Sequence, residues 1–328
     1  MHVPDGIIPL WLQITFFVVS GLMFVVSYRK VKAQFDDRLV PFMGVLAAVI
    51  FAAQLVNFPI PPFSSGHLVG STLLAVLVSP WVAMLIMALV LFIQALFGDG
   101  GLLTYGLNAF NMAIFSVLVG YGLALMLFRA TRGHTTRERS LVFSAGIASF
   151  IATVSAAFVL GIELLSVPGF SLAALMAITW IHALIGVGEA ILTAIILGYF
   201  IKVNPKLVML LRDGTPERVE ERPSAEEEAV EPMDQERWIT RQTVPLLLTA
   251  VAIVAFVILA GLASGNPDGF EWALFIFAGV SEPEGTFDGL FASLGSNPVI
   301  DVITGLVGIL AALGLAYLVF TLVSRKKG

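Results

Sequence analysis

The first six residues, Met1-His2-Val3-Pro4-Asp5-Gly6, place an imidazole one residue away from an α-amine. A divalent ion can bind the amine of Met1, the deprotonated backbone nitrogen of His2 and the ring nitrogen of His2 nearest the backbone, which closes two fused chelate rings in one plane. Planar nitrogen ligation suits Ni(II) and Cu(II), whereas Zn(II) prefers a tetrahedral site and Mg(II) or Ca(II) prefer oxygen. Pro4 has no backbone N–H and cannot extend the chelate, so one in-plane position stays open.

A distant histidine can supply that fourth donor. His67 follows the proline-containing segment 57–66, and we expect it at the start of a short helix, 67–78, that is sunk into the protein. Two plainer interpretations stay open: His2 as a solvated terminal residue, and His67 as a residue satisfied by local backbone. His134 lies in a basic segment, and we expect it to be solvated and to bind no metal.

Several other polar residues could support the ligands or tether helices. Asn108 and Asn111 share a helix face, as do His182 and Glu189, and polar groups inside a membrane usually face a partner in the bundle interior. For these four we favour structural tethers over a role in metal transfer. The full set of candidate supporting residues is Asp5, Ser65, Asn108, Asn111, His182 and Glu189.

Composition identifies a polytopic membrane protein, because hydrophobic residues make up 58% of the 328 and charged residues only 12%. The first apolar stretch lacks a basic n-region and a cleavage site, so we expect a retained span. No cysteine is present, which excludes disulfides and thiolate ligands. No phosphate-binding loop motif occurs, so we expect a binding protein, not an enzyme, with its energy supplied elsewhere.

Apolar runs predict an all-α protein with a bundle of seven helices followed by two more membrane helices. The predicted domains are a metal-binding unit at 1–203, an acidic cytoplasmic linker at 204–241 and an accessory domain at 242–328. The helices are expected near 7–27, 39–57, 67–78, 80–97, 102–128, 141–165, 171–201, 244–263 and 299–323.

The basic residues predict the orientation in the membrane. With the N-terminus outside and the C-terminus in the cytoplasm, all eighteen Lys and Arg residues fall on the cytoplasmic side. Met1, His2 and His67 are then on the outer side. A stripe of small residues in the seventh helix permits close contact with another helix of this chain or with a neighbouring subunit; it consists of Gly186, Ala190, Ala194 and Gly198.

Segments 1–6, 65–70, 94–101 and 182–190 resemble the NikM/CbiM family, the nickel- or cobalt-binding substrate (S) components of energy-coupling factor importers. The resemblance covers about residues 1–203 and implies a seven-helix S-component fold. It also implies a metal site made by the Met1 amine, the His2 amide and ring and the His67 ring. The implied partners are a transmembrane coupling subunit and ATPase subunits in a prokaryotic cell membrane.

The segment Pro267-Asp268-Gly269-Phe270-Glu271 resembles the NikN-type (PDGLE) accessory subunit, with Phe270 where that family usually has Leu. This fusion favours nickel, with cobalt as the alternative, although ligand chemistry alone does not rank Ni(II), Co(II) and Cu(II). The acidic outer loop 265–301 either raises the local concentration of cations or is a plain solvated loop. The resemblance implies instead that it contacts the outer face near Met1 and controls metal entry.

The predicted function is therefore capture of Ni(II) by the membrane subunit of an ATP-driven importer, with the lipid bilayer but no nucleic acid among its partners. A metal-binding sensor or scaffold that does not transport is the rival from another class. An S component for an organic vitamin is disfavoured, because the terminal chelate would then have no use.

Overall fold

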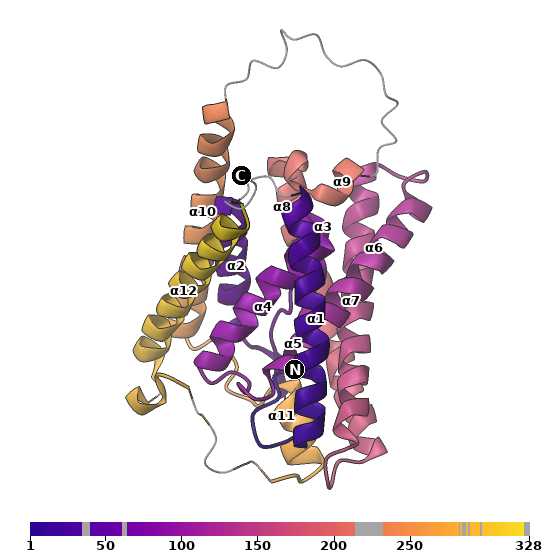
Figure 1. Ribbon diagram of the computed structural model, residues 1–328, viewed down its shortest axis with the longest axis vertical. Coiled ribbons are helices and arrows are strands. Elements are labelled where there is room, and N and C mark those ends of the chain that lie inside the picture. Colours follow the sequence, from indigo (N-terminus) through magenta and orange to yellow (C-terminus); the bar gives the residue numbers. More distant parts are fainter. Residues whose placement is uncertain are drawn as a thin grey trace.

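The computed structural model describes residues 1–34, 40–60, 64–213, 232–281, 283, 287, 289–295 and 297–324. This part of the chain is overwhelmingly helical (Figure 1). Five of its helical stretches are long and apolar enough to cross a membrane, namely Leu10–Ala33, Tyr105–Thr131, Arg137–Leu164, Leu172–Val203 and Pro298–Ser324. The prediction of an all-α polytopic membrane protein is confirmed.

The first unit contains every helix expected from the apolar runs. Its helices are α1 (Leu10–Gln34), α2 (Val40–Gln54), α3 (Ser71–Val78), α4 (Pro80–Leu96), α5 (Tyr105–Ala109), α6 (Ser116–Thr131), α7 (Arg137–Leu164) and α8 (Leu172–Val203). A π-helical turn, η2 (Phe110–Phe115), joins α5 to α6, so the two helices form one span. The core lies where the buried α3 meets α4, α6 and α7.

The stretch before α3 differs from the prediction. Strand β1 (Phe58–Ile60) pairs antiparallel with β2 (Ser64–Gly66), and α3 begins only at Ser71. His67 therefore lies in the connection after β2 and not at the start of a helix. The physical reason is Gly70, whose φ of 78° is a left-handed conformation that separates His67 from the helix.

The break between α3 and α4 follows from local chemistry. Ser79 adopts a φ of 110°, and its hydroxyl accepts a hydrogen bond from the backbone N–H of Val82 at 3.3 Å. Pro80 occupies the first position of α4, where its missing N–H costs nothing. Two short helices in series thus replace one long span.

The C-terminal part follows α8 and supplies two helices that pack against α2. It contains η3 (Pro205–Leu207), α9 (Met209–Asp213), α10 (Pro232–Leu259), α11 (Gly269–Glu271), η4 (Trp272–Phe277), η5 (Ala292–Leu294) and α12 (Pro298–Ser324). Both α10 and α12 contact α2. Residues 214–231 of the predicted linker lie outside the described residues, but α9 and the first turns of α10 occupy the rest of it as helix.

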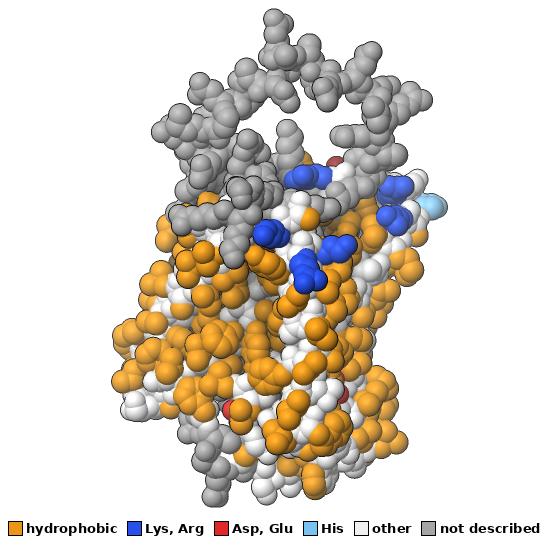
Figure 2. All heavy atoms as spheres, viewed as in Figure 1, with side chains coloured by type: hydrophobic (Ala, Val, Ile, Leu, Met, Phe, Trp, Pro, Cys, Tyr) orange, Lys and Arg blue, Asp and Glu red, His pale blue; other side chains and the backbone are white. Residues whose placement is uncertain are grey.

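The two ends of the bundle differ in charge. In Figure 1 the N-terminus lies near α5 and α11, while the last described turns of α12 lie toward the opposite end. The Lys and Arg side chains visible in Figure 2 gather toward that opposite end, and hydrophobic side chains cover the flank between. The bundle therefore has one basic end, and the N-terminus is remote from it.

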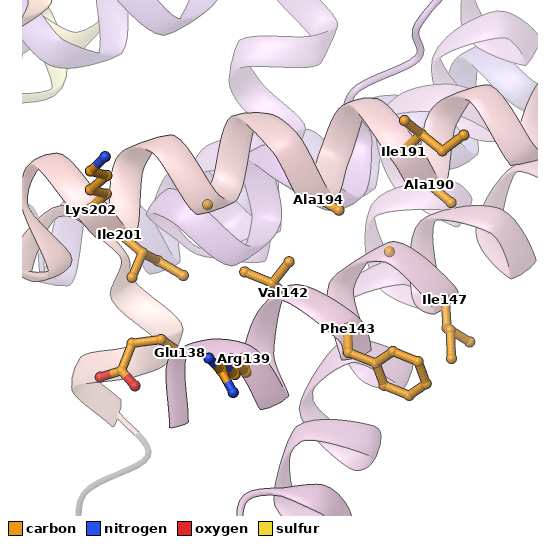
Figure 3. A pocket seen from close by; sticks show the side chains of 12 residues that line it. Glu138, Arg139, Val142, Phe143, Ile147, Ala190, Ile191, Ala194, Ile201 and Lys202 are labelled. Carbon is orange, nitrogen blue, oxygen red and sulfur yellow. The ribbon is translucent and has the colours of Figure 1, made fainter. Parts of the chain in front are cut away.

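The stripe of small residues contacts α7 along part of its length. A Cβ added at Gly146 of α7 would lie 3.3 Å from the Ala190 carbonyl oxygen, whereas one at Gly198 would meet nothing within 4 Å. Where the two helices separate, a groove of about 600 Å³ opens, with Arg139 and Lys202 among its lining residues (Figure 3). None of the predicted metal-site residues lines this groove.

Candidate metal centre

The N-terminal strap, residues 1–6, folds back into the protein. Met1, His2 and Val3 are all buried. The backbone N–H of Val3 donates to Asn108 Oδ1 at 2.9 Å, and Asn108 Nδ2 donates to the Val3 carbonyl at 3.0 Å. Gly101 N–H donates to the same carbonyl at 3.0 Å. Asn108 of α5 therefore fixes the strap immediately after His2.

Asp5 anchors the other end of the strap. Its carboxylate accepts hydrogen bonds from the backbone N–H groups of Leu102 at 3.1 Å, Leu103 at 2.8 Å and Thr104 at 3.0 Å. Carboxylate acceptors of this kind are stronger than neutral ones. Both of its oxygens are thereby engaged, so Asp5 holds the chain that carries the candidate ligands.

The rings of His2 and His67 lie beside each other. Their centroids are 5.1 Å apart and their planes differ by 23°. His2 Nδ1 lies 3.1 Å from Asp99 Oδ1, whereas His2 Nε2 is buried and has no hydrogen-bond partner in the described part of the chain. Buried polar atoms rarely lack a partner, so the His2 ring is a candidate for binding a group from outside the chain.

The approach of Asp99 depends on the turn that carries it. Gly100 has a φ of 89°, and a Cβ there would lie 3.3 Å from the His2 Cβ and 3.0 Å from Asn108 Nδ2. A glycine therefore allows this turn to pack against the strap.

His67 is prepared to bind through one nitrogen. Its Nδ1 lies 3.0 Å from the carbonyl oxygen of Leu68, and because a carbonyl only accepts, Nδ1 carries the proton. The lone pair is then on Nε2, and such backbone contacts commonly orient histidine ligands. Burial, followed by the electrostatic effects of His2 and the N-terminal ammonium, lowers the pKa of His67 to about 4. The ring is therefore neutral at pH 7, as a ligand must be.

A carboxylate from the C-terminal part reaches the same place. Asp268 Oδ2 lies 3.2 Å from the Met1 amine, although the two residues are 267 positions apart. Burial raises the pKa of the Asp268 carboxyl, but the N-terminal ammonium and the backbone N–H of Glu271 outweigh burial and hold it below its ordinary value. Asp268 was not among the predicted site residues. Two sequence features include Asp268. The Asp-x-x-Glu pattern identifies a helix start, and the resemblance of segment 267–271 to the accessory subunit places its loop near Met1 without naming Asp268 as the contact.

Two predicted supporting residues lie close to the ligands but serve the backbone around them. Glu189 accepts hydrogen bonds from the N–H groups of Val69 and Gly70, both at 2.8 Å, and so ties α8 to the connection that carries His67. Ser65 binds the C-terminal part, because its hydroxyl donates to the Asn266 carbonyl at 2.8 Å.

The remaining two predicted supporting residues, His182 and Asn111, form hydrogen bonds within the helical bundle. His182 Nδ1 lies 2.8 Å from the Ile178 carbonyl on its own helix. Asn111 Nδ2 donates to Glu163 Oε2 at 2.7 Å, which joins the π-helical turn to α7. Each of these polar groups thus has a structural partner.

The assembled donors are an amine, a backbone amide nitrogen and two imidazoles. Within the described ranges no group of three or more His, Cys, Asp and Glu side chains is arranged to hold a metal ion. Two of the four candidate donors are main-chain nitrogens, so the candidate site does not require three such side chains. Nitrogen donors suit late transition metals. Fold and donors together define a multi-pass membrane protein with a candidate transition-metal site at one end.

The chain belongs to the family described as the cobalt uptake substrate-specific transmembrane region, whose model matches residues 2–207. It is therefore a membrane subunit of a transport system. A relative from Haloquadratum walsbyi is 37% identical over 211 residues, which cover 63% of this chain and 93% of the relative. The fused nickel transport protein NikMN of Rhodobacter capsulatus is 31% identical over 236 residues, or 66% of this chain and 67% of the relative. A crystal structure of a truncated transition metal transporter is 31% identical with a TM-score of 0.56, and the match covers 62% of this chain and 99% of that one.

Proposed function

We propose that this chain is the substrate-capturing subunit of an ATP-driven nickel importer of the energy-coupling factor type. The observation that carries the proposal is that Met1, His2 and His67 are all buried, with the His2 and His67 rings stacked and His2 Nε2 without a hydrogen-bond partner in the described part of the chain. The family supports transport, and the fused nickel transport relative supports nickel as the substrate.

In this proposal the candidate metal site faces the outside of the cell. The basic end of the bundle then lies in the cytoplasm, in agreement with the usual distribution of Lys and Arg in membrane proteins (Figure 2). The ion loses its water to the Met1 amine and the His2 amide and ring, and Nε2 of His67 closes the plane. His67 does not have to lose a proton first at neutral pH, because its pKa is about 4.

Release to the cytoplasm requires partners. Four nitrogen donors hold a planar ion tightly, so a coupling subunit driven by separate ATPase subunits must change the geometry of the strap. The chain from residue 242 onward acts as the fused accessory domain, a role supported by its packing on α2 and by the contact of Asp268 with Met1. The subunit itself catalyses no reaction.

The test is metal content and uptake of the full chain, produced with its coupling and ATPase partners in mixed trace metals. We expect stoichiometric Ni(II) in the wild type and His134→Ala, since His134 lies on the exposed turn after α6. His67→Ala should lose bound nickel and uptake. Stoichiometric nickel in His67→Ala would refute the site, cobalt in place of nickel would assign the alternative substrate, and binding without uptake would favour a sensor.

A further inference from the structure

The C-terminal part of the chain is built into the surface that covers the candidate site. We define residues 264–278 as the docking segment. Ser65 N–H donates to the Pro267 carbonyl at 2.9 Å, and Ser264 N–H donates to the Asn57 carbonyl at 2.8 Å. Phe270 and Leu274 are fully buried. This segment therefore has a fixed position relative to β1, β2 and the strap.

Contact with α8 leaves little space for a different residue at the tip of the segment. A Cβ added at Gly269 would lie 3.0 Å from His182 Cε1 and would also collide with Ile181. The glycine next to Asp268 thus allows the backbone to approach α8 closely enough for the carboxylate to reach Met1.

The two oxygens of Asp268 have separate tasks. Oδ1 accepts the backbone N–H groups of Phe270 and Glu271, both at 2.8 Å, and caps α11. The backbone N–H of Asp268 donates to the Glu271 carboxylate at 2.9 Å, which completes a capping box. Oδ2 is left to face the Met1 amine at 3.2 Å. The cap fixes the carboxylate, and the carboxylate in turn faces the amine.

Charge gives this contact a role in metal binding. A divalent ion bound by one deprotonated amide and three neutral nitrogens keeps one net positive charge, and an uncompensated buried charge is costly. The Asp268 side chain is 16% exposed and Asp99 is 48% exposed, so solvent screens Asp268 far less. A coordinated amine also retains N–H groups that can donate to Oδ2.

We propose that Asp268 of the docking segment is a positioning residue of the metal site, which holds the Met1 amine in the chelating position and balances the charge of the bound ion. The proposal rests on the proposed function. The metal site would then be formed both by the region that the family model matches, residues 2–207, and by the chain that follows it, which contains Asp268.

Neutral variants of Asp268 that keep the helix cap test this role. Asn and Ser are as good at helix N-caps as Asp, so Asp268→Asn and Asp268→Ser should leave the docking segment in place. Glu271→Gln is the matched control, because it removes a nearby negative charge from the same segment without touching the Met1 amine. The measurements are nickel affinity by chelator competition, the Ni(II) d–d absorption at saturation and the melting temperature without metal, all on the full chain.

We expect both Asp268 variants to bind nickel at least about tenfold more weakly, because each loses a charge-assisted contact. The planar absorption at saturating nickel should be retained, and the melting temperature without metal should be unchanged. Glu271→Gln should stay within about threefold of the wild type. The proposal is overturned if Asp268→Asn also stays within threefold, if Glu271→Gln is equally weak, or if the melting temperature falls along with affinity in both Asp268 variants. A wild type without planar nickel would instead refute the proposed function.

Discussion

Replacing Asp5 by alanine should weaken nickel binding although Asp5 is not a proposed ligand. The change removes the acceptor for the N–H groups of Leu102, Leu103 and Thr104. Leu103 is 59% exposed and can bond to water, but Thr104 is fully buried and its N–H is left without a partner. We estimate a loss of about 3 kcal/mol from one buried unpaired donor and the weakened contacts of the other two.

That loss acts on the metal-free strap. If nickel binds only the anchored strap, its apparent affinity falls with the anchored fraction, by up to roughly 100-fold for about 3 kcal/mol. Chelator competition measures the affinity, and the d–d band at saturating nickel reports the ligand set. Asp5→Asn keeps one acceptor oxygen and should lose less. Affinity of Asp5→Ala within twofold of wild type would refute the anchoring argument, and an altered band at saturation would make Asp5 a ligand.

Two further predictions concern the connection that carries His67. Glu189→Ala leaves the buried N–H groups of Val69 and Gly70 unpaired and should destabilise the fold by about 2–6 kcal/mol; thermal unfolding in detergent should show this, while the exposed Glu138→Ala stays within about 0.5 kcal/mol. Nickel affinity should fall as pH falls, by about 100-fold per unit where the amine and amide each lose a proton on binding. His67 adds nothing above its pKa of about 4, so a titration of the His67 ring between pH 6 and 8, followed by NMR of the metal-free protein, would contradict its neutral state.

The membrane helices were predictable because each lies in a long apolar run, and the break before α4 was predictable from Ser79-Pro80. The hairpin at β1 and β2 was not, because its strands are three residues long and show no alternation that would distinguish them from a loop. That hairpin and Gly70 displaced His67 from the predicted helix start.

The two histidines could be proposed as partners from ligand chemistry, but their surroundings could not. The contacts between Val3 and Asn108, or between Met1 and Asp268, join residues far apart in the chain, and no periodicity encodes such a pairing. Asp99 likewise reaches His2 only because of the turn at Gly100. The candidate ligands could therefore be predicted from the sequence, whereas the residues that position them could be identified only from the tertiary structure.

The central claim is that the first atom of the chain binds the metal. One residue added before Met1 converts its amine into an amide and displaces the chelate, although His2 and His67 are both kept. The direct measurement is the d–d absorption of low-spin planar Ni(II) in two forms of the full chain, one with an N-terminal extension and one with a tag after Gly328. We predict that the N-terminal extension abolishes the band and the C-terminal tag leaves it unchanged, whereas equal absorption in both forms would contradict the N-terminal chelate.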